Sequence, residues 1–202
     1  FALIGVPSSA GARRTGQERG PQAFRAAGLL ERLRANGLDV ADLGDLPSVS
    51  FRPDPDNPRQ QNFSLVVDVA RQVADRVDEA VASGRRPLVL GGDCSLSLGV
   101  MEGLLRNHPG LGLMYFDADV DLNTPDTTAS GVADGMVLAH ALGRGDPELA
   151  RVGPRVPLLS EQDIVLFGYD IGSDWIDPPE IDFLEGSRMS KYPLAHVRTD
   201  AA

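Results

Sequence analysis

The chain has 202 residues, of which 42% are hydrophobic and 22 are glycine, and its formal net charge is -10 at pH 7. This length suits one well-buried domain and is short for two, so we expect a single domain over residues 1–202. The acidic balance argues against nucleic acid and anionic membranes as partners, since both attract clustered Lys and Arg. It fits a cationic or guanidinium-bearing ligand better, although many acidic proteins use their charge for solubility alone.

The sequence also gives an expectation for the cellular location of the protein. No stretch is apolar for long enough to span a bilayer, and the start FALIGVPSS lacks the basic region of a signal peptide. The single cysteine, Cys94, has no partner for an internal disulfide, which agrees with a reducing compartment. We therefore expect a cytoplasmic protein. Because the chain opens on Phe1, already inside a strand-like run, we expect it to be trimmed at that end.

The first part of the chain predicts strands that alternate with helices. Residues 1–7 form a short apolar run ending at a proline, which is typical of a buried parallel strand, and a polar loop over 11–20 follows. Pro21 predicts the start of a helix, and residues 38–43 predict the next strand. A proline-rich stretch over 53–58 is too short for an interdomain linker. The apolar residues that recur at helical spacing after Pro21 are Phe24, Leu29, Leu30 and Leu33.

A long amphipathic helix is the clearest element of the middle region. Ser64 is its expected N-cap, and residues 87–90 then predict a strand that ends in GGDC. Ser95 begins another helix, which extends to Leu105, and an apolar run over 111–116 predicts the next strand. The residues that line one face of the long helix are Leu65, Val66, Val69, Val73, Val77 and Ala80.

The last third continues the alternation. A loop leads to a helix around residues 136–142, residues 164–168 predict a strand, and residues 190–197 predict a last one. Strands alternating with helices at this interval indicate a parallel sheet covered on both faces. The sequence therefore predicts an α/β fold.

The segment DADVDLNTPDTTASGVADG carries most of the chemistry. Its aspartates Asp117, Asp119 and Asp121 alternate directly after the strand over 111–116, and open α/β sheets bind their ligands at the carboxyl ends of strands. After another strand, the glycines of GGDCS allow a sharp turn that points Cys94 into the same crevice. Two polar strand ends in one sheet therefore predict a shared site.

Carboxylates of this kind suit Mg²⁺, Ca²⁺ or Mn²⁺, whereas a thiolate at Cys94 shifts the preference towards Zn²⁺. Two ions about 4 Å apart turn a shared water into hydroxide near neutral pH, which is the basis of metal-assisted hydrolysis. The alternative is structural, because aspartates in loops cap helices and make turns and a lone cysteine is often a small buried hydrophobe. The three histidines, His108, His140 and His196, are interpreted as structural or solvated.

Three segments together resemble the arginase and agmatinase family, the ureohydrolases: GPQAFRAAGLLERLRANGLDVADLGDLP, GGDCSLSLG and YFDADVDLNTPDTTASGVADGMVLAHALG. The likeness extends from the first strand to about Gly168, and its loop motif DLNTPxTxxSG is highly specific. It implies a three-layer αβα sandwich with a mainly parallel sheet and a binuclear Mn²⁺ centre. It also implies hydrolysis of a carbon–nitrogen bond in a guanidino or amidino compound, and a homo-oligomer, either a trimer or a hexamer.

The resemblance assigns roles to individual residues. Asp117 and Asp121 match aspartate ligands of the metal centre. Cys94 stands where the family motif GGDHS has a ligand histidine, and Asp119 stands where DAHxD has another. Asp134 occupies the place of a histidine used near the substrate in proton transfer. The implied site thus has Cys94, Asp117, Asp119 and Asp121 as metal ligands and Asp134 as the catalytic group.

The same likeness makes Asn123, Thr128 and Ser130 substrate-binding residues, since they match loop residues that contact the amino-acid end of the substrate. Val132 replaces an asparagine of that loop. The third family motif, an SxDxDxxDP-like strand end, is missing, because residues 173–178 echo it only superficially. We therefore expect a domain that is incomplete at its C-terminal end and stops before that motif.

The substitutions change the charge of the centre. Asp119 and an ionised Cys94 each add a negative charge where the family has a neutral imidazole, and extra anionic ligands raise the pKa of bound water. The sequence favours a divergent metal-dependent hydrolase, because the new groups are themselves ionisable. The alternative is an inactive homologue that binds a ligand or a partner subunit, or that serves only in assembly.

Overall fold

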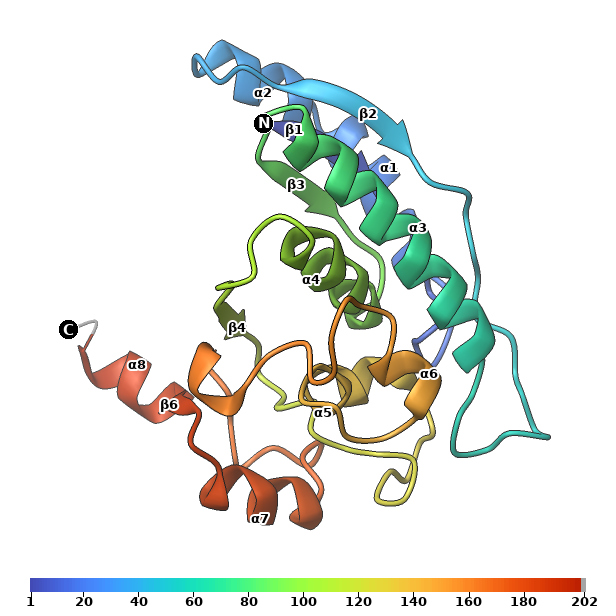
Figure 1. Ribbon diagram of the computed structural model, residues 1–202, viewed down its shortest axis with the longest axis vertical. Coiled ribbons are helices and arrows are strands. Elements are labelled where there is room, and N and C mark those ends of the chain that lie inside the picture. The colour runs from blue at the N-terminus through green and yellow to red at the C-terminus, as the bar shows by residue number, and fades with distance from the viewer. Residues whose placement is uncertain (201–202) are drawn as a thin grey trace.

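The structure is a computed structural model that describes residues 1–200. Its first sheet has the strand order β2-β1-β3 and is parallel throughout (Figure 1). The strands are β1 (Ala2–Gly5), β2 (Ala41–Asp45) and β3 (Pro87–Leu90). Every residue of the central strand β1 is buried, which confirms the buried parallel strand expected at the start of the chain.

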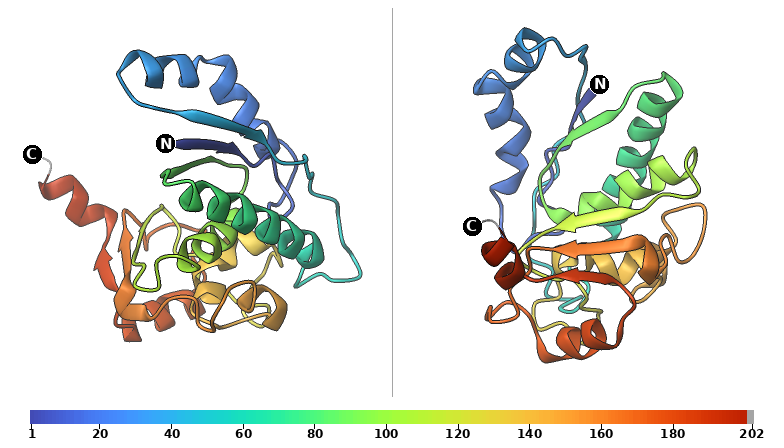
Figure 2. Two further views of the ribbon diagram at one scale, coloured as in Figure 1. Left: turned by 45° about the horizontal axis from the view of Figure 1, so that its top comes forward. Right: turned by 90° about the vertical axis from the view of Figure 1, so that its left-hand side faces the viewer.

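Helices cover both faces of this sheet (Figure 2). The short helices α1 (Gly20–Ala26) and α2 (Leu29–Ala35) lie on one face, where α2 leucines pack against Leu3 and Leu90. On the other face, α3 (Phe63–Ala82) packs against Ile4 and its neighbours through a buried apolar stripe. The result is the three-layer αβα arrangement with parallel strands that the sequence predicts. The stripe residues facing β1 are Val69, Val73, Val77 and Ala80.

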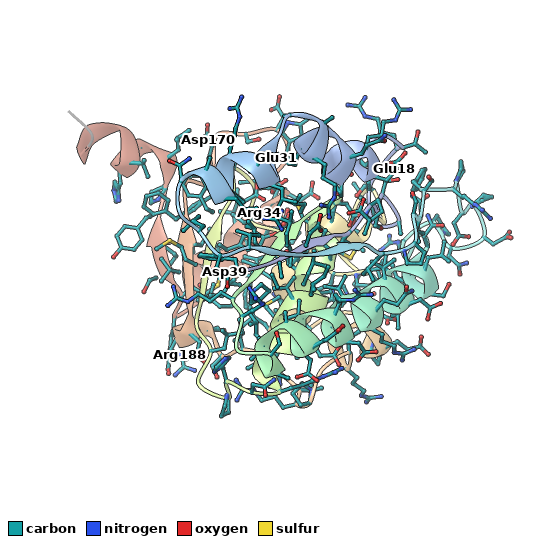
Figure 3. All side chains as sticks on the ribbon, turned by 90° about the horizontal axis from the view of Figure 1, so that it is seen from above. Glu18, Glu31, Arg34, Asp39, Asp170 and Arg188 are labelled. Carbon is teal, nitrogen blue, oxygen red and sulfur yellow. The ribbon has the colours of Figure 1, made fainter. Side chains whose placement is uncertain are left out.

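Two helix boundaries differ from the predictions. The helix expected to run from Pro21 through Leu33 is broken at Gly28, whose φ of 75° is left-handed. Phe24, assigned to its apolar face, is 50% exposed. The long helix begins at Phe63 because Asn62, with a φ of 58°, precedes it, so Ser64 is not its N-cap. Arg34 of α2 donates to the carbonyl of Val40 and ties the helix to the approach to β2 (Figure 3).

The second sheet has the order β4-β5-β6 and is also parallel. Its strands are β4 (Leu113–Phe116), β5 (Ile164–Phe167) and β6 (Ser190–Tyr192). Within residues 1–200 the two sheets share no hydrogen-bonded strand pair. The strand expected over 190–197 ends at Tyr192, and helix α8 (Leu194–Asp200) follows Pro193, where the loss of a backbone N–H suits a helix start.

The two faces of the second sheet differ. Tyr115, Ile164 and Leu166 belong to the main core. On the opposite face Met114 is 68% and Phe116 72% exposed, and Phe116 stacks on Phe167 at a centroid distance of 5.3 Å. The second sheet thus has one covered and one open face in the described structure.

The remaining elements surround the core. The helices are α4 (Ser97–Leu105), α5 (Val137–Ala141), α6 (Pro147–Ala150) and α7 (Pro178–Gly186). The 3-10 turns are η1 (Gln17–Arg19), η2 (Cys94–Leu96), η3 (Ala133–Met136) and η4 (Glu161–Asp163). In the described part of the chain, no helix combines the length and apolarity that crossing a bilayer requires.

Helices α3 and α4 approach each other through glycines. A Cβ atom added at Gly99 of α4 would lie 2.3 Å from the backbone oxygen of Ala70 in α3, and one at Gly103 would lie 2.5 Å from that of Ala74. These contacts are possible only without side chains. Because α4 directly follows η2, this close packing sets the position of Cys94 at the start of η2.

Candidate functional site

The turn after β3 is held close to the loop after β1. A Cβ at Gly92 would lie 2.0 Å from the Ser8 carbonyl oxygen, so this approach needs glycine. Asp93 accepts hydrogen bonds from the backbone N–H groups of Gly11 and Ser95, at 3.1 and 3.0 Å. Asp93 thus joins the two loops and caps η2, and Cys94 is the residue of the turn that faces the site.

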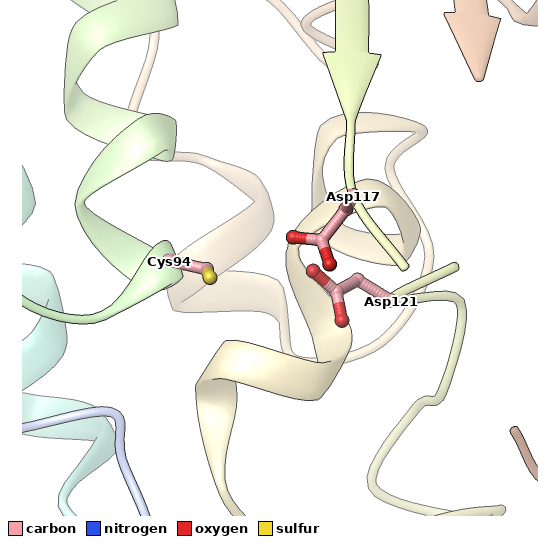
Figure 4. Close-up of side chains that lie close together, drawn as sticks. All are labelled: Cys94, Asp117 and Asp121. Carbon is pink, nitrogen blue, oxygen red and sulfur yellow. The ribbon is translucent and has the colours of Figure 1, made fainter. Parts of the chain in front are cut away.

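Three ligand atoms converge beyond the ends of β3 and β4. The sulfur of Cys94 and one carboxylate oxygen each of Asp117 and Asp121 lie within 4.8 Å of one another (Figure 4). In the described part of the chain this is the one group of three or more such residues. Three sequence-predicted metal ligands are therefore brought together by the fold. The sequence predicts that two strand ends of one sheet meet, whereas β3 and β4 belong to different sheets and their ends still converge.

Asp121 is the most buried member of this group. Its exposure is 4%, its φ of 47° is left-handed, and the Tyr115 hydroxyl donates to its carboxylate. Burial raises the pKa of Asp121 well above its usual value, and the charge of Asp117 adds to the effect. The left-handed turn is what brings this carboxylate back towards the sheet edge.

Asp119 and Asp134 line the same cavity, of about 210 Å³, but lie outside the converging group. The Asp119 carboxylate accepts from the backbone N–H of Val120 at 2.9 Å. Burial raises the pKa of Asp134 to about 6, with a further contribution from Asp93, while Arg13 opposes the shift. Asp134 therefore titrates close to neutral pH, where a general acid or base is most effective.

The loop residues Asn123, Thr128 and Ser130 are not among the described residues that line this cavity. The Asn123 amide donates to Asp177 at 3.0 Å. The Thr128 hydroxyl accepts from the backbone N–H groups of Ser130 and Gly131. The side chains of Asn123 and Thr128 are thus engaged within the loop and its support.

A buried glutamate supports this loop. Glu180 is 1% exposed and accepts from the backbone N–H groups of Leu122 and Asn123 at 2.8 and 3.0 Å. Its second oxygen accepts from Asp177, which forms the reciprocal capping box of α7. The capping pattern D-P-P-E is visible in the sequence, but its contact with a loop nearly sixty residues away is not.

Arg13 and Trp175 also line the acidic cavity, and sequence reasoning does not identify them. The Arg13 guanidinium carbon lies 5.1 Å from the centroid of the Trp175 ring, a cation–π contact. Arg13 comes from the polar loop after β1, and Trp175 from the segment that echoes the missing third motif. Neither segment has a periodic pattern that would assign it to the site.

The donor set fits a divalent cation. Burial, and then the charges of Asp121 and Asp117, raise the pKa of the Cys94 thiol, so its ionisation beside these carboxylates is unfavourable without a cation. A cation among these atoms would reverse that effect and favour the ionised forms. The residues suit one ion with mixed oxygen and sulfur ligands.

Raised carboxyl pKa values predict how stability depends on pH. The pKa of Asp134 is raised to about 6 and that of Glu180 to about 7, chiefly by burial. Their protonation favours the folded state below the unfolded pKa, and this advantage is lost as pH rises through the folded pKa. We expect the free energy of unfolding of metal-free protein to fall between about pH 4 and pH 7. Urea unfolding in chelator at pH 5 and pH 7.5 measures this, and higher stability at pH 7.5 contradicts it.

Comparison with known proteins shows which family the chain resembles. A family model described as the arginase family matches residues 1–199. Arginase of Bacillus caldovelox is 38% identical over 199 residues, which is 98% of this chain and 65% of that protein. Human arginase-1 is 40% identical over 200 residues, again 98% of this chain and 61% of the relative. The chain thus spans somewhat less than two thirds of the length of these curated relatives.

Solved structures of arginases have the same fold as this chain. The crystal structure of arginase from Bacillus cereus matches with a TM-score of 0.87 and 33% identity, over 98% of this chain and 65% of that one. A Trypanosoma cruzi formiminoglutamase with Mn²⁺ matches with a TM-score of 0.69 at 21% identity, over 98% of this chain and 61% of that one, and so shares the fold.

Proposed function

Because the chain belongs to the arginase family, we propose that its acidic cavity hydrolyses a carbon–nitrogen bond of a guanidino or amidino compound. The observation that carries this proposal is the convergence of Cys94, Asp117 and Asp121 within 4.8 Å. The acidic lining suits a cationic guanidino group, and the family's hydrolases supply the reaction class. The activity of the whole protein is proposed on this basis.

We propose that Cys94, Asp117 and Asp121 hold a divalent ion, with Asp119 as a further ligand from the same cavity. The family is known for a binuclear metal site, and the resemblance to it makes two Mn²⁺ ions the expectation, whereas the three converging donors of this chain suit one ion. When bound, such an ion lowers the pKa of a water molecule so that attack occurs at neutral pH. The buried carboxylates of the chain supply the negative charge that retains the metal.

Asp134 is the proposed proton carrier. In the hydrolysis, the water oxygen bonds to the guanidino carbon, the carbon–nitrogen bond breaks, and the departing nitrogen receives a proton. The protonated Asp134 carboxyl can donate that proton, since its pKa of about 6 keeps both forms populated near neutrality. The proton lost by the attacking water restores the protonated carboxyl.

Asn123, Thr128 and Ser130 are the proposed contacts for the far end of the substrate. Glu180 accepts from the backbone N–H of Asn123, and the Asn123 amide donates to Asp177, so a substrate contact through that amide N–H competes with its bond to Asp177. A single domain over residues 1–202, a cytoplasmic location and a homo-oligomer, trimer or hexamer, stay predictions from the sequence and the family.

Replacing Asp134 tests the proton transfer. We expect Asp134→Asn to lower kcat about 100-fold or more, because the amide neither accepts nor donates the proton. Because the protonated carboxyl is the donor, the wild-type rate should fall as pH rises through about 6, and this fall should be absent in the variant. A variant with the wild-type rate and pH profile excludes Asp134 from proton transfer. The pH–rate profile at saturating Mn²⁺ is the measurement.

The function as a whole is tested by metal analysis and product assays. Purified protein loaded with Mn²⁺ should release urea or a related amide from at least one member of a panel of arginine, agmatine and other guanidino and amidino compounds. The alternative, an inactive homologue that binds a ligand or forms an oligomer, is favoured by the replacement of imidazoles with Cys94 and Asp119. Failure to retain metal, with no turnover over the whole panel, supports that alternative.

A further inference from the structure

A separate pocket lies beside the start of α6 (Figure 1 labels this helix). Its volume is about 390 Å³, which is within the usual range for small-molecule sites. One wall is the loop segment 124–126, and another is the turn 144–147. Among the residues that the structure describes, this pocket and the acidic cavity share no lining residue. The pocket is therefore distinct from the candidate active site.

The guanidinium of Arg144, which lines this pocket, has no hydrogen-bond partner. Across residues 1–200 its side chain forms neither an ion pair nor a hydrogen bond, and its Nη1 atom is buried. The guanidinium carbon lies 3.6 Å from the centroid of the Phe183 ring in α7. This cation–π contact offsets part of the cost of burying the charge. Arg144 thus leaves a positive group available to an anion.

The acidic side chains nearest in effect to Arg144 are engaged elsewhere. Burial lowers the pKa of Arg144, and the charge of Glu161 opposes the shift. The Glu161 carboxylate, however, accepts from the backbone N–H of Arg188 at 2.8 Å. The Asp146 carboxylate accepts from two backbone N–H groups of α6, at 2.8 and 3.1 Å, and from the Gln60 amide. These contacts hold both carboxylates away from a direct pair with Arg144.

The loop wall of the pocket carries an available carboxylate. Asp126 is exposed, and within the described residues its side chain forms no hydrogen bond and no ion pair. Its backbone is fixed, because Arg59 donates to the carbonyl oxygens of Asp126 and Pro125 at 2.9 and 3.3 Å. The pocket thus presents one unengaged negative group and one unengaged positive group.

The turn that carries Arg144 is held by a buried histidine. The backbone N–H of Asp146 donates to Nε2 of His140 at 3.1 Å, so Nδ1 donates to the Met136 carbonyl at 2.8 Å. Gly145 has a φ of 91°, and a Cβ there would lie 2.9 Å from the same Nε2, so the turn requires glycine. Both walls are therefore ordered before a ligand binds, which lowers the cost of binding.

A ligand that carries both charges fits these walls better than a ligand with one. A simple anion would meet the carboxylates of Asp126 and Asp146, and a simple cation would meet Arg144. A guanidinium has the planar donor geometry that a carboxylate accepts, and a carboxylate accepts well from an ammonium. Pro125 and Pro147 add apolar surface between the charged groups.

We propose that this pocket binds a free α-amino acid with an apolar side chain, whose carboxylate lies on Arg144 and whose ammonium lies on Asp126. The site goes beyond the proposed hydrolysis and does not depend on it, because the described lining residues of the two cavities differ. Binding here needs no metal.

Calorimetry on the 202-residue chain in chelator tests the site. The probe is L-phenylalanine, and phenylpropionate and phenylethylamine are half-ligands that keep the ring but lack the ammonium and the carboxylate. We expect wild type to bind the amino acid at least about tenfold more tightly than either half-ligand, the scale of one hydrogen bond to a charged group. A rise in melting temperature with L-phenylalanine gives a second readout.

Two variants separate the two ends of the ligand. Arg144→Gln should lose about tenfold in affinity for L-phenylalanine and phenylpropionate, with no loss for phenylethylamine. Asp126→Asn should lose about tenfold for L-phenylalanine and phenylethylamine, with no loss for phenylpropionate. Because Asp126 is exposed, its variant tests the site even where Arg144→Gln does not fold.

The matched control is Arg151→Gln, because Arg151 is exposed nearby in the sequence and is not among the residues that line the pocket. It should keep all three affinities. Absence of L-phenylalanine binding, equal affinity for the amino acid and both half-ligands, or binding that neither Arg144→Gln nor Asp126→Asn weakens overturns the inference.

Discussion

Replacing Asp121 by Asn is expected to abolish the Mn²⁺-dependent rise in melting temperature and to reduce turnover below detection. Asp121 is the buried member of the converging group and lies 4% exposed beside Cys94 and Asp117. Its amide has almost the same shape, but it lacks the charge that holds a divalent ion. A ligand at 100 times its Kd stabilises the folded state by about 2.7 kcal/mol, which the variant should lose.

The same substitution should leave the metal-free protein at least as stable as wild type. Burial raises the pKa of Asp121 well above its usual value, so its carboxylate is unfavourable at neutral pH without a cation. Asp126→Asn is the matched control, because Asp126 is exposed in the neighbouring loop and outside the group. Melting temperatures measured in chelator and in Mn²⁺ test both expectations. A D121N protein that Mn²⁺ stabilises as strongly as wild type contradicts the proposed ligand set.

Gly99→Ala is expected to cost about 3 kcal/mol or more in the free energy of unfolding, at the upper end of overpacking effects. The new Cβ would lie 2.3 Å from the backbone oxygen of Ala70, so α3 or α4 must shift rather than one flexible side chain. Since α4 directly follows η2, the shift also displaces Cys94. We therefore expect weaker Mn²⁺ binding in the variant as well.

Gly110→Ala serves as the control for this prediction. A Cβ at Gly110 meets no atom within 4 Å, and its φ is not left-handed, so we expect a change of no more than about 0.5 kcal/mol. Urea unfolding of both variants is the measurement. If Gly99→Ala is as stable as Gly110→Ala, helices α3 and α4 move apart at little cost. Their close packing then does not determine the position of Cys94.

Periodic elements were predictable from the sequence, whereas their ends were less so. The apolar stripe of α3 follows from spacing alone, because Val66, Val73 and Val77 recur on one helical face and are buried. Its start was placed at Ser64 from side-chain capping preference, but the left-handed backbone of Asn62 ends the preceding loop one residue before the helix. Local backbone conformation of this kind has only a weak sequence signal.

Some residues of the candidate site were also predictable from the sequence, and others were not. Cys94, Asp117 and Asp121 follow strands, so their place at strand ends was predictable, whereas the division of these strands between two sheets was not. Arg13, Trp175 and the support by Glu180 come from irregular segments that lie far from the motifs in sequence. Such contacts depend on tertiary packing, which spacing in the sequence does not encode.

The open face of the second sheet affects how firmly the two halves of the site are held. Cys94 follows β3, which pairs with the buried strand β1, whereas Asp117 and Asp121 follow β4, whose side chains Met114 and Phe116 face solvent. Hydrogen exchange should therefore be slower in β1 than in β4, because fewer apolar contacts oppose local opening of β4. An ion bound by both strand ends would link the end of β4 to the more rigid first sheet and so oppose local opening of β4.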